Sequence, residues 1–146
     1  DLRAKMGVKI YGCDTCQQVC PKNTNIQKAN SEEFIPKLTN GVVNIEEIMT
    51  FSNKDFKEKY GTMSGAWRGK NVLKRNAIIA LANIGDNSCM DLLKDALYDE
   101  SPMIREYAAW AIIKVDKVSG KEIVQERILE EKNIEVAEEM KRLLEF

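Results

Sequence analysis

The chain has 146 residues, of which 44% are hydrophobic and 31% charged, so it carries enough apolar side chain to form a core and is not a disordered chain. It contains no histidine, which excludes imidazole acid–base catalysis, Ser-His and Cys-His nucleophile pairs and His-ligated metal sites within this sequence. The net charge is −1, but residues 1–80 hold 13 Lys and Arg against 8 Asp and Glu, whereas residues 81–146 hold 9 against 15. The basic half is suited to a polyanion, although an imbalance of this size also arises by chance.

The sequence has no apolar run of the ~18 residues that a membrane-spanning helix needs, and its first residues do not have the pattern expected of a signal peptide. It begins at Asp1 rather than Met, so we expect it to be part of a longer protein. We further expect a cytoplasmic monomer that does not associate with membranes.

Residues 1–43 are expected to form an irregular arm, because they contain two of the three prolines and an Asn-rich polar stretch. Three of the four cysteines lie here, with the spacing C-x2-C-x3-C-P: Cys13, Cys16 and Cys20, followed by Pro21. This is the end of the ferredoxin-type motif C-x2-C-x2-C-x3-C-P, whose last cysteine binds the other cluster of a two-cluster domain. On that pattern, Cys13 and Cys16 bind one [4Fe–4S] cluster and Cys20 binds the neighbouring one.

Other uses of these cysteines stay open. A zinc site would need a fourth ligand, and without histidine the only candidate is Cys89, which stands in a predicted helix and reads more simply as a small buried hydrophobe. Free thiols or a Cys13–Cys16 redox pair are further alternatives. Since three cysteines cannot complete two cubanes, the remaining ligands should lie upstream or on another chain, and this sequence alone should hold no intact cluster.

From residue 44 onward the pattern predicts helices. The first, 45–50, begins with Asn44 in a capping box with Glu47. The second, 53–60, ends at a glycine and is followed by a glycine-rich loop over 61–70.

A repeat follows this loop. Residues 74–85 align with 105–116 at an offset of 31, with Ala and Leu or Ile at matching positions, and a third equivalent helix is predicted over 134–145. A period near 30 with two helices per unit is typical of an α-solenoid. The residues expected to cap the later helices at their N-termini are Asn87, Ser101 (followed by Pro102), Ser119 and Asn133.

The repeat pattern over about 72–146 resembles the short HEAT-like repeats of the phycobilisome-lyase type, which serve as scaffolds or binding surfaces. The predicted fold is therefore mostly α: an irregular iron–sulfur-motif arm over 1–43, followed over 44–146 by a short right-handed α-solenoid of HEAT-like helix pairs.

Aromatic and basic residues gather where the glycine-rich loop meets the first repeat: Trp67, Arg68, Lys70, Lys74 and Arg75. The cations could neutralise phosphates, and an exposed Trp67 could stack on a splayed RNA base. Alternatively, Trp67 is buried against the first repeat and the charges only solvate it. Trp110, on the second Ala-rich helix, is expected to be a core residue.

The segment 6–23, MGVKIYGCDTCQQVCPKN, resembles the second cluster motif of the epoxyqueuosine reductase family, and WRGK at 67–70 and LKRN at 73–76 resemble its entry into a C-terminal HEAT-like domain. The resemblance covers about 1–115 and implies a C-terminal fragment of such an enzyme. Lys22 departs from the family pattern, in which Trp is frequent at this position.

Membership implies a cytosolic oxidoreductase that converts epoxyqueuosine to queuosine in tRNA, binds the anticodon region, and uses two [4Fe–4S] clusters and cobalamin. The cobalamin domain, its catalytic acid and the first cluster motif are not in this sequence, so no catalysis is expected from this chain by itself. A second hypothesis is a HEAT-like interaction module fused to another iron–sulfur protein, such as a relative of the corrinoid-dependent dehalogenases.

Overall fold

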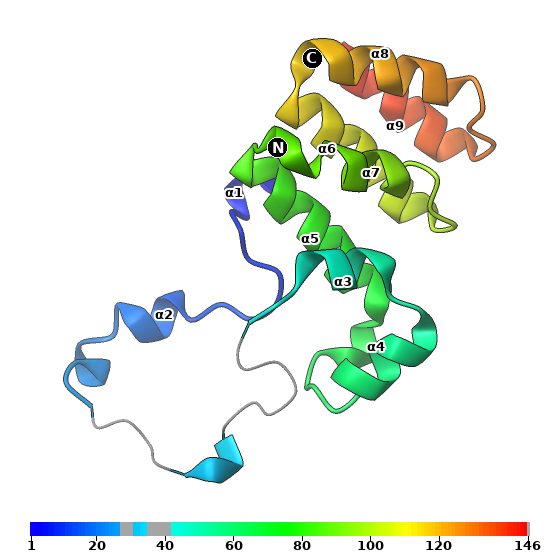
Figure 1. Cartoon of the computed structure of the whole chain (residues 1–146). Coiled ribbons are helices and arrows are strands. Elements are labelled where there is room, and N and C mark those ends of the chain that lie inside the picture. The colour runs from blue at the N-terminus through cyan, green and yellow to red at the C-terminus, as the bar shows by residue number, and fades with distance from the viewer. Residues whose placement is uncertain (27–30, 35–41, 146) are drawn as a thin grey trace.

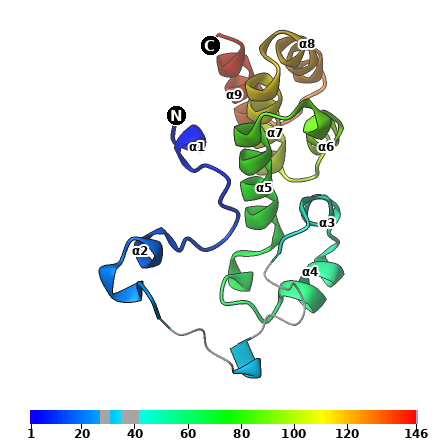
Figure 2. The same ribbon diagram turned by 60° about the vertical axis from the view of Figure 1, so that its left-hand side comes forward.

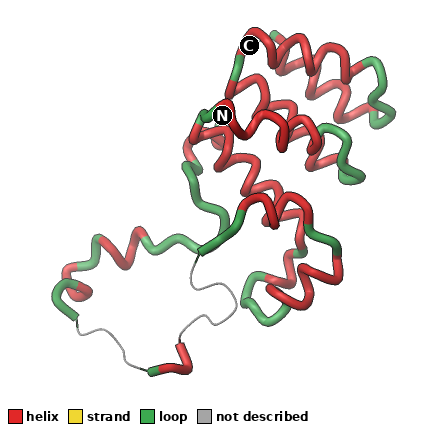
Figure 3. The backbone as a smooth tube through the Cα atoms, viewed as in Figure 1, coloured by secondary structure: helices red, strands yellow, loops and turns green. Residues whose placement is uncertain are grey.

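The computed structural model describes residues 1–26, 31–34 and 42–145. Their secondary structure is helical without a strand, as Figure 3 shows. The helices are α1 (Leu2–Lys5), α2 (Thr15–Gln18), α3 (Ile45–Thr50), α4 (Asn53–Tyr60), α5 (Lys70–Ile84), α6 (Met90–Ala96), α7 (Pro102–Val115), α8 (Lys117–Ile128) and α9 (Ile134–Leu144). Short 3-10 turns cover Pro21–Asn23, Glu32–Phe34, Ala66–Arg68 and Asn87–Cys89. None of the helices in these ranges is long and apolar enough to cross a bilayer.

The predicted fold class is confirmed, with the helices from α3 to α9 stacked in sequence order (Figure 1). The central helix is α7, which contacts α5 and α6 of the preceding pair as well as α8 and α9. α3 and α4 lie at the end of α5 away from α8 and α9, and α2 lies apart from the helical stack (Figure 2). Part of the predicted irregular arm, including Pro36, lies outside the described residues.

Small side chains let the helices of the stack approach closely. Ala77 on α5 and Ala108 on α7, which the repeat alignment matches, are fully buried, and so is Ala111 on α7. On α8, Gly120 is buried so near α7 that an added Cβ would lie 2.7 Å from the Ile112 carbonyl oxygen. Trp110 is 7% exposed and confirms the prediction that it is a core residue.

The first two predicted helices are confirmed to the residue, but their capping differs from the prediction. The Asn44 side chain accepts a hydrogen bond from the Glu47 amide at 3.1 Å, as expected. The Glu47 carboxylate does not return to Asn44, because it binds the Lys59 ammonium at 2.7 Å. The reciprocal capping box lies instead at the start of α4, between Ser52 and Asp55.

Two of the four predicted N-caps of the later helices are wrong. Asp116 caps α8 by accepting from the amides of Val118 and Ser119, so the helix begins before Ser119, and Ser119 lies inside it. The turn after α5 is capped by Asp86 rather than Asn87. The reason is the same in both cases. An aspartate lies closer to the end of the preceding helix than the residue predicted to cap, and its carboxylate accepts the amide hydrogen bonds. Ser101 takes the N-cap position of α7, without a side-chain bond, and Asn133 caps α9 as predicted.

A buried charge cluster joins α7, α8 and the turn that follows α8. Glu131, whose side chain is 1% exposed, accepts hydrogen bonds from Arg105 at 2.8 Å and from Arg127 at 3.0 Å. Arg127 also donates through Nε to the Leu97 carbonyl at 3.1 Å. These bonds hold the pKa of Glu131 at about 2, chiefly through the Arg105 hydrogen bonds.

Candidate functional site

The three clustered cysteines lie around the short helix α2. Cys13 precedes it, Cys16 is in its only turn, and Cys20 follows it immediately before the Pro21–Asn23 turn. All three are free thiols; Cys13 and Cys16 are exposed, and Cys20 is half-buried. The segment is held by its own backbone, since the amides of Gln17 and Gln18 donate to the Asp14 carbonyl at 2.9 and 2.8 Å. The three thiols therefore lie within one short, locally hydrogen-bonded segment of the arm.

The donor set has the chemistry of an iron–sulfur ligand set. The Thr15 hydroxyl lies 3.1 Å from Cys13 Sγ, and this hydrogen bond lowers the pKa of the Cys13 thiol. The thiolate is the form that binds metals, so three free cysteines in one short segment are, by their chemistry, suitable ligands for a thiolate-ligated cluster. Within the described ranges, no three His, Cys, Asp or Glu side chains are arranged as a metal site.

Cys89 is separate from this segment. It is 6% exposed, and its thiol donates to the Asp86 carbonyl at 2.8 Å. Burial raises the pKa of the Cys89 thiol, which makes it a poor nucleophile and a poor ligand. The expectation that Cys89 is a small buried residue is confirmed.

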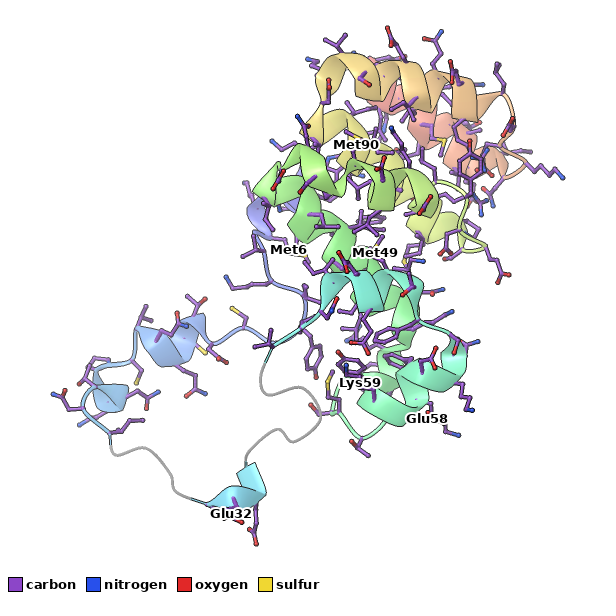
Figure 4. The ribbon with its side chains drawn as sticks, viewed as in Figure 1. Met6, Glu32, Met49, Glu58, Lys59 and Met90 are labelled. Carbon is purple, nitrogen blue, oxygen red and sulfur yellow. The ribbon has the colours of Figure 1, made fainter. Side chains whose placement is uncertain are left out.

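The start of the arm, before the cysteines, packs against the helical stack, although the predicted boundary at residue 43 assigned the two to separate parts of the chain. Met6 and Ile10 pack against the core, and Met6 lies beside α5 (Figure 4). Two asparagines of α5 bind carbonyls of the arm: Asn83 donates to those of Arg3 and Gly7, and Asn76 donates to that of Ile10. Sequence reasoning missed these contacts, although Asn76 stands in the LKRN segment that resembled the reductase family; Asn83 lies seven residues later on the same helix.

The aromatic part of the predicted RNA-binding cluster is exposed. Trp67 is 77% exposed on the Ala66–Arg68 turn, so the alternative in which it is buried against the first repeat is wrong. The Arg68 guanidinium lies 4.4 Å from the Trp67 ring centroid, in cation–π contact. Next to this turn, Ser64 lies 3.0 Å from the hydroxyl of Tyr11, two residues before Cys13. The loop with Trp67 is thus tied to the cysteine arm.

The remaining three members of that cluster have partners within the protein. Lys70 donates to the Phe51 carbonyl at 3.1 Å, and Lys74 pairs with Asp99 at 2.6 Å. Burial raises the pKa of Asp99, but hydrogen bonds from Lys74 and the Ser101 amide outweigh it and hold the pKa below its usual value. Arg75 donates two hydrogen bonds to the Asn76 side chain. RNA contact by the five residues stays a prediction, and the structure separates exposed Trp67 and Arg68 from these three.

Residues 69–145 match the family model for HEAT repeats. The chain belongs to the HEAT-repeat family. Its relatives extend the similarity over the whole sequence: the chain is 44% identical to epoxyqueuosine reductase from Bacillus anthracis, covering all of this chain and 39% of that protein. It is 38% identical to the Bacillus subtilis epoxyqueuosine reductase, covering all of this chain and 38% of that protein. The chain thus spans about two fifths of the length of these relatives.

Solved structures show that the similarity in fold also extends beyond the HEAT repeats, over almost the whole chain. A selenomethionine-labelled epoxyqueuosine reductase superposes with a TM-score of 0.87 at 37% identity, covering 99% of this chain and 39% of that one. An epoxyqueuosine reductase solved with an epoxyqueuosine-modified tRNA-Tyr stem loop gives a TM-score of 0.83 at 35% identity, over 99% of this chain and 39% of that chain. The resemblance to epoxyqueuosine reductases that the cysteine motif indicated is confirmed over the full chain.

Proposed function

We propose that this chain forms part of an epoxyqueuosine reductase, which reduces epoxyqueuosine in tRNA, and that it contributes cluster ligands and a tRNA-facing helical domain. The observation that carries the proposal is the full-length 44% identity to a reductase of that name, which takes in the cysteine arm as well as the repeats. A HEAT-like module on an unrelated iron–sulfur protein would share only the repeats. We assign the protein to the cytoplasm, where thiols stay reduced.

In this proposal Cys13 and Cys16 bind one [4Fe–4S] cluster and Cys20 binds a second. When bound, the clusters and a cobalamin held outside this chain supply the electrons for removing the epoxide oxygen. The task of this chain is to hold the thiolates in place. The Thr15 hydroxyl favours the Cys13 thiolate, and the turn of α2 presents Cys16 between Cys13 and Cys20.

For tRNA binding we propose that Trp67 and Arg68 make the first contacts. A base stacked on an exposed aromatic ring contributes roughly 1–3 kcal/mol, and a neighbouring guanidinium adds phosphate attraction. The other three would first have to leave their partners to reach a phosphate: Lys70 the Phe51 carbonyl, Lys74 Asp99 and Arg75 Asn76. The anticodon region is the tRNA part we expect here.

A replacement experiment tests the proposal as a whole. The part of the Bacillus subtilis reductase that aligns with this chain is exchanged for it, and the chimera is expressed in a reductase-deficient strain. Nucleosides from total tRNA are then quantified by mass spectrometry. We expect queuosine to replace epoxyqueuosine, and Cys13→Ser or Cys20→Ser to restore epoxyqueuosine. Cys89→Ser is the matched control and should leave queuosine unchanged; a chimera that folds and binds tRNA but leaves only epoxyqueuosine would contradict the proposal.

The RNA contact is tested separately with a tRNA anticodon stem loop. Trp67→Ala should weaken binding about tenfold by loss of stacking, and Arg68→Ala by a smaller factor that shrinks as salt rises. Tyr98→Ala is the matched control, because Tyr98 is 67% exposed and has the Arg127 guanidinium 5.1 Å from its ring centroid. Equal affinities of the Trp67→Ala and Tyr98→Ala proteins would overturn the assignment of Trp67.

A further inference from the structure

The path of the cysteine arm is fixed by side chains of α5 that bind its backbone. The Asn83 amide donates to the carbonyls of Arg3 and Gly7, at 3.0 and 2.9 Å, and the Asn76 amide donates to that of Ile10 at 2.7 Å. The two asparagines are partly buried and lie two helical turns apart, on one face of α5. They therefore hold the first ten residues of the arm, ahead of the cysteines.

The orientation of the Asn76 side chain is itself held. Arg75 donates to the Asn76 carbonyl oxygen through Nε at 3.1 Å and Nη2 at 2.9 Å. These bonds leave the amide nitrogen facing the arm, because the oxygen is engaged on the other side. The Arg75 guanidinium lies 5.7 Å from the centroid of Tyr107 on α7, which keeps it in position. Arg75 thus contributes to holding the arm by fixing the orientation of the Asn76 side chain.

The arm reinforces this grip with its own side chains. The Arg3 guanidinium lies 5.1 Å from the Trp110 ring centroid and 3.6 Å from the Glu139 carboxylate, with only 16% of its side chain exposed. Gly7 has a φ of +65°, a conformation that favours glycine, so the chain can turn between the two asparagines. Tyr11 then contacts Ser64 and lies over Gly65.

We infer that Asn76 and Asn83 are positioning residues for the iron–sulfur segment: they fix the point and direction at which the chain leaves the helical repeats, three residues before Cys13. The inference rests on the proposed function, in which Cys13 binds a cluster. Residues 12–26 contain no buried side chain, so their placement depends on this attachment. The HEAT repeats would then set the cluster's surroundings as well as face RNA.

The test uses the intact holoenzyme with two single variants. Asn76→Asp keeps the acceptor for Arg75 but replaces the donor to Ile10 by a carboxylate, and Asn83→Leu removes both of its bonds at similar size. Asn87→Asp is the matched control, since Asn87 is exposed in the turn after α5. If the inference is right, trypsin should cleave after Lys9 about tenfold faster in both variants, because the arm opens more often.

A second readout separates positioning from general stability. The EPR spectrum of the reduced clusters should change in both variants, and iron should be lost in air several-fold faster, while Asn87→Asp matches the wild type. An unchanged cleavage rate in both variants would show that Asn76 and Asn83 do not hold the arm against α5. Faster cleavage with an unchanged EPR spectrum would overturn its role in positioning the cluster. Cys13→Ser, measured alongside, reports on the proposed function: full iron retention in that variant contradicts the ligand assignment whatever the cleavage rates show.

Discussion

The helical repeats and the cysteine arm are stabilised by different kinds of contact. The fully buried side chains of the repeats lie on several helices and pack on one another, among them Ile78, Leu93, Ile104, Ile112 and Met140. In the arm, the described residues 1–26 include no buried side chain, and the contacts to the stack are partly polar. The repeats therefore form the cooperative unit, and the arm is attached to it.

This difference suits the two tasks in the proposed function. A platform for RNA needs a surface that does not change shape, which a packed core provides. A cluster-binding segment must accept its metal after the chain is made, so its thiols stay accessible, and its position is set by a few hydrogen bonds. The following predictions test the comparison, from the largest expected effect to the smallest.

The largest effect is expected from Glu131→Gln in the repeats. The substitution leaves the guanidinium groups of Arg105 and Arg127 buried without their counter-charge, and should lower the free energy of unfolding by roughly 3–5 kcal/mol. Urea unfolding followed by circular dichroism measures the change. Glu58→Gln is the control, because Glu58 forms an exposed pair with Lys54. Similar losses in both variants would show that the buried cluster does not stabilise the repeats.

The same carboxylate makes the stability of the repeats depend on pH. Its pKa falls from 4.5 to about 2 on folding, so its contribution is complete above about 4.5 and is lost as the pH falls towards 2. Unfolding curves measured across this window should show a loss that the Glu131→Gln protein lacks. If both proteins lose stability equally over the window, other carboxylates are responsible.

A smaller effect is expected from removing the cap of α8. Asp116→Ala should lower the free energy of unfolding by about 1 kcal/mol, because the amides of Val118 and Ser119 lose their acceptor. Ser119→Ala, which changes a residue predicted to cap but found inside the helix, should have little effect. The reverse order would mean that α8 begins at Ser119.

The smallest effect is expected in the arm. Tyr11→Phe removes the hydrogen bond to Ser64 from a side chain that is 50% exposed, and should change the free energy of global unfolding by less than about 0.5 kcal/mol. Thermal unfolding of the variant measures this directly. A loss of more than about 1 kcal/mol would make the arm part of the cooperative unit and remove the distinction between the two regions.

The sequence predicted those features that depend on neighbours along the chain. Apolar periodicity placed α3, α4 and α9 to within a residue, and the offset of 31 identified the repeat. The cysteine motif and its flanking residues resembled those of the epoxyqueuosine reductases, to which the chain is similar over all its residues. Local capping was less predictable, because Asp116 and Ser119 can both cap a helix, and the choice depends on where α7 ends.

Contacts between distant residues could not be predicted from the sequence. Lys74 was expected to be available to RNA, but Asp99, 25 residues later, pairs with it in the fold. The carbonyls that bind Asn76 and Asn83 are 66 to 80 residues away, so the residues next to each asparagine in the sequence do not indicate that it binds the arm. The 77% exposure of Trp67, on the short turn between α4 and α5, could likewise not be predicted from the sequence.

The most direct test of the central claim is the iron content of the intact enzyme that carries this chain, after anaerobic reconstitution. Two cubanes correspond to roughly eight iron atoms per chain. We predict that Cys13→Ser, Cys16→Ser and Cys20→Ser each lower this value, while Cys89→Ser, the same change at a buried position, leaves it intact. Full iron content in all three arm variants would contradict the claim that this chain supplies cluster ligands.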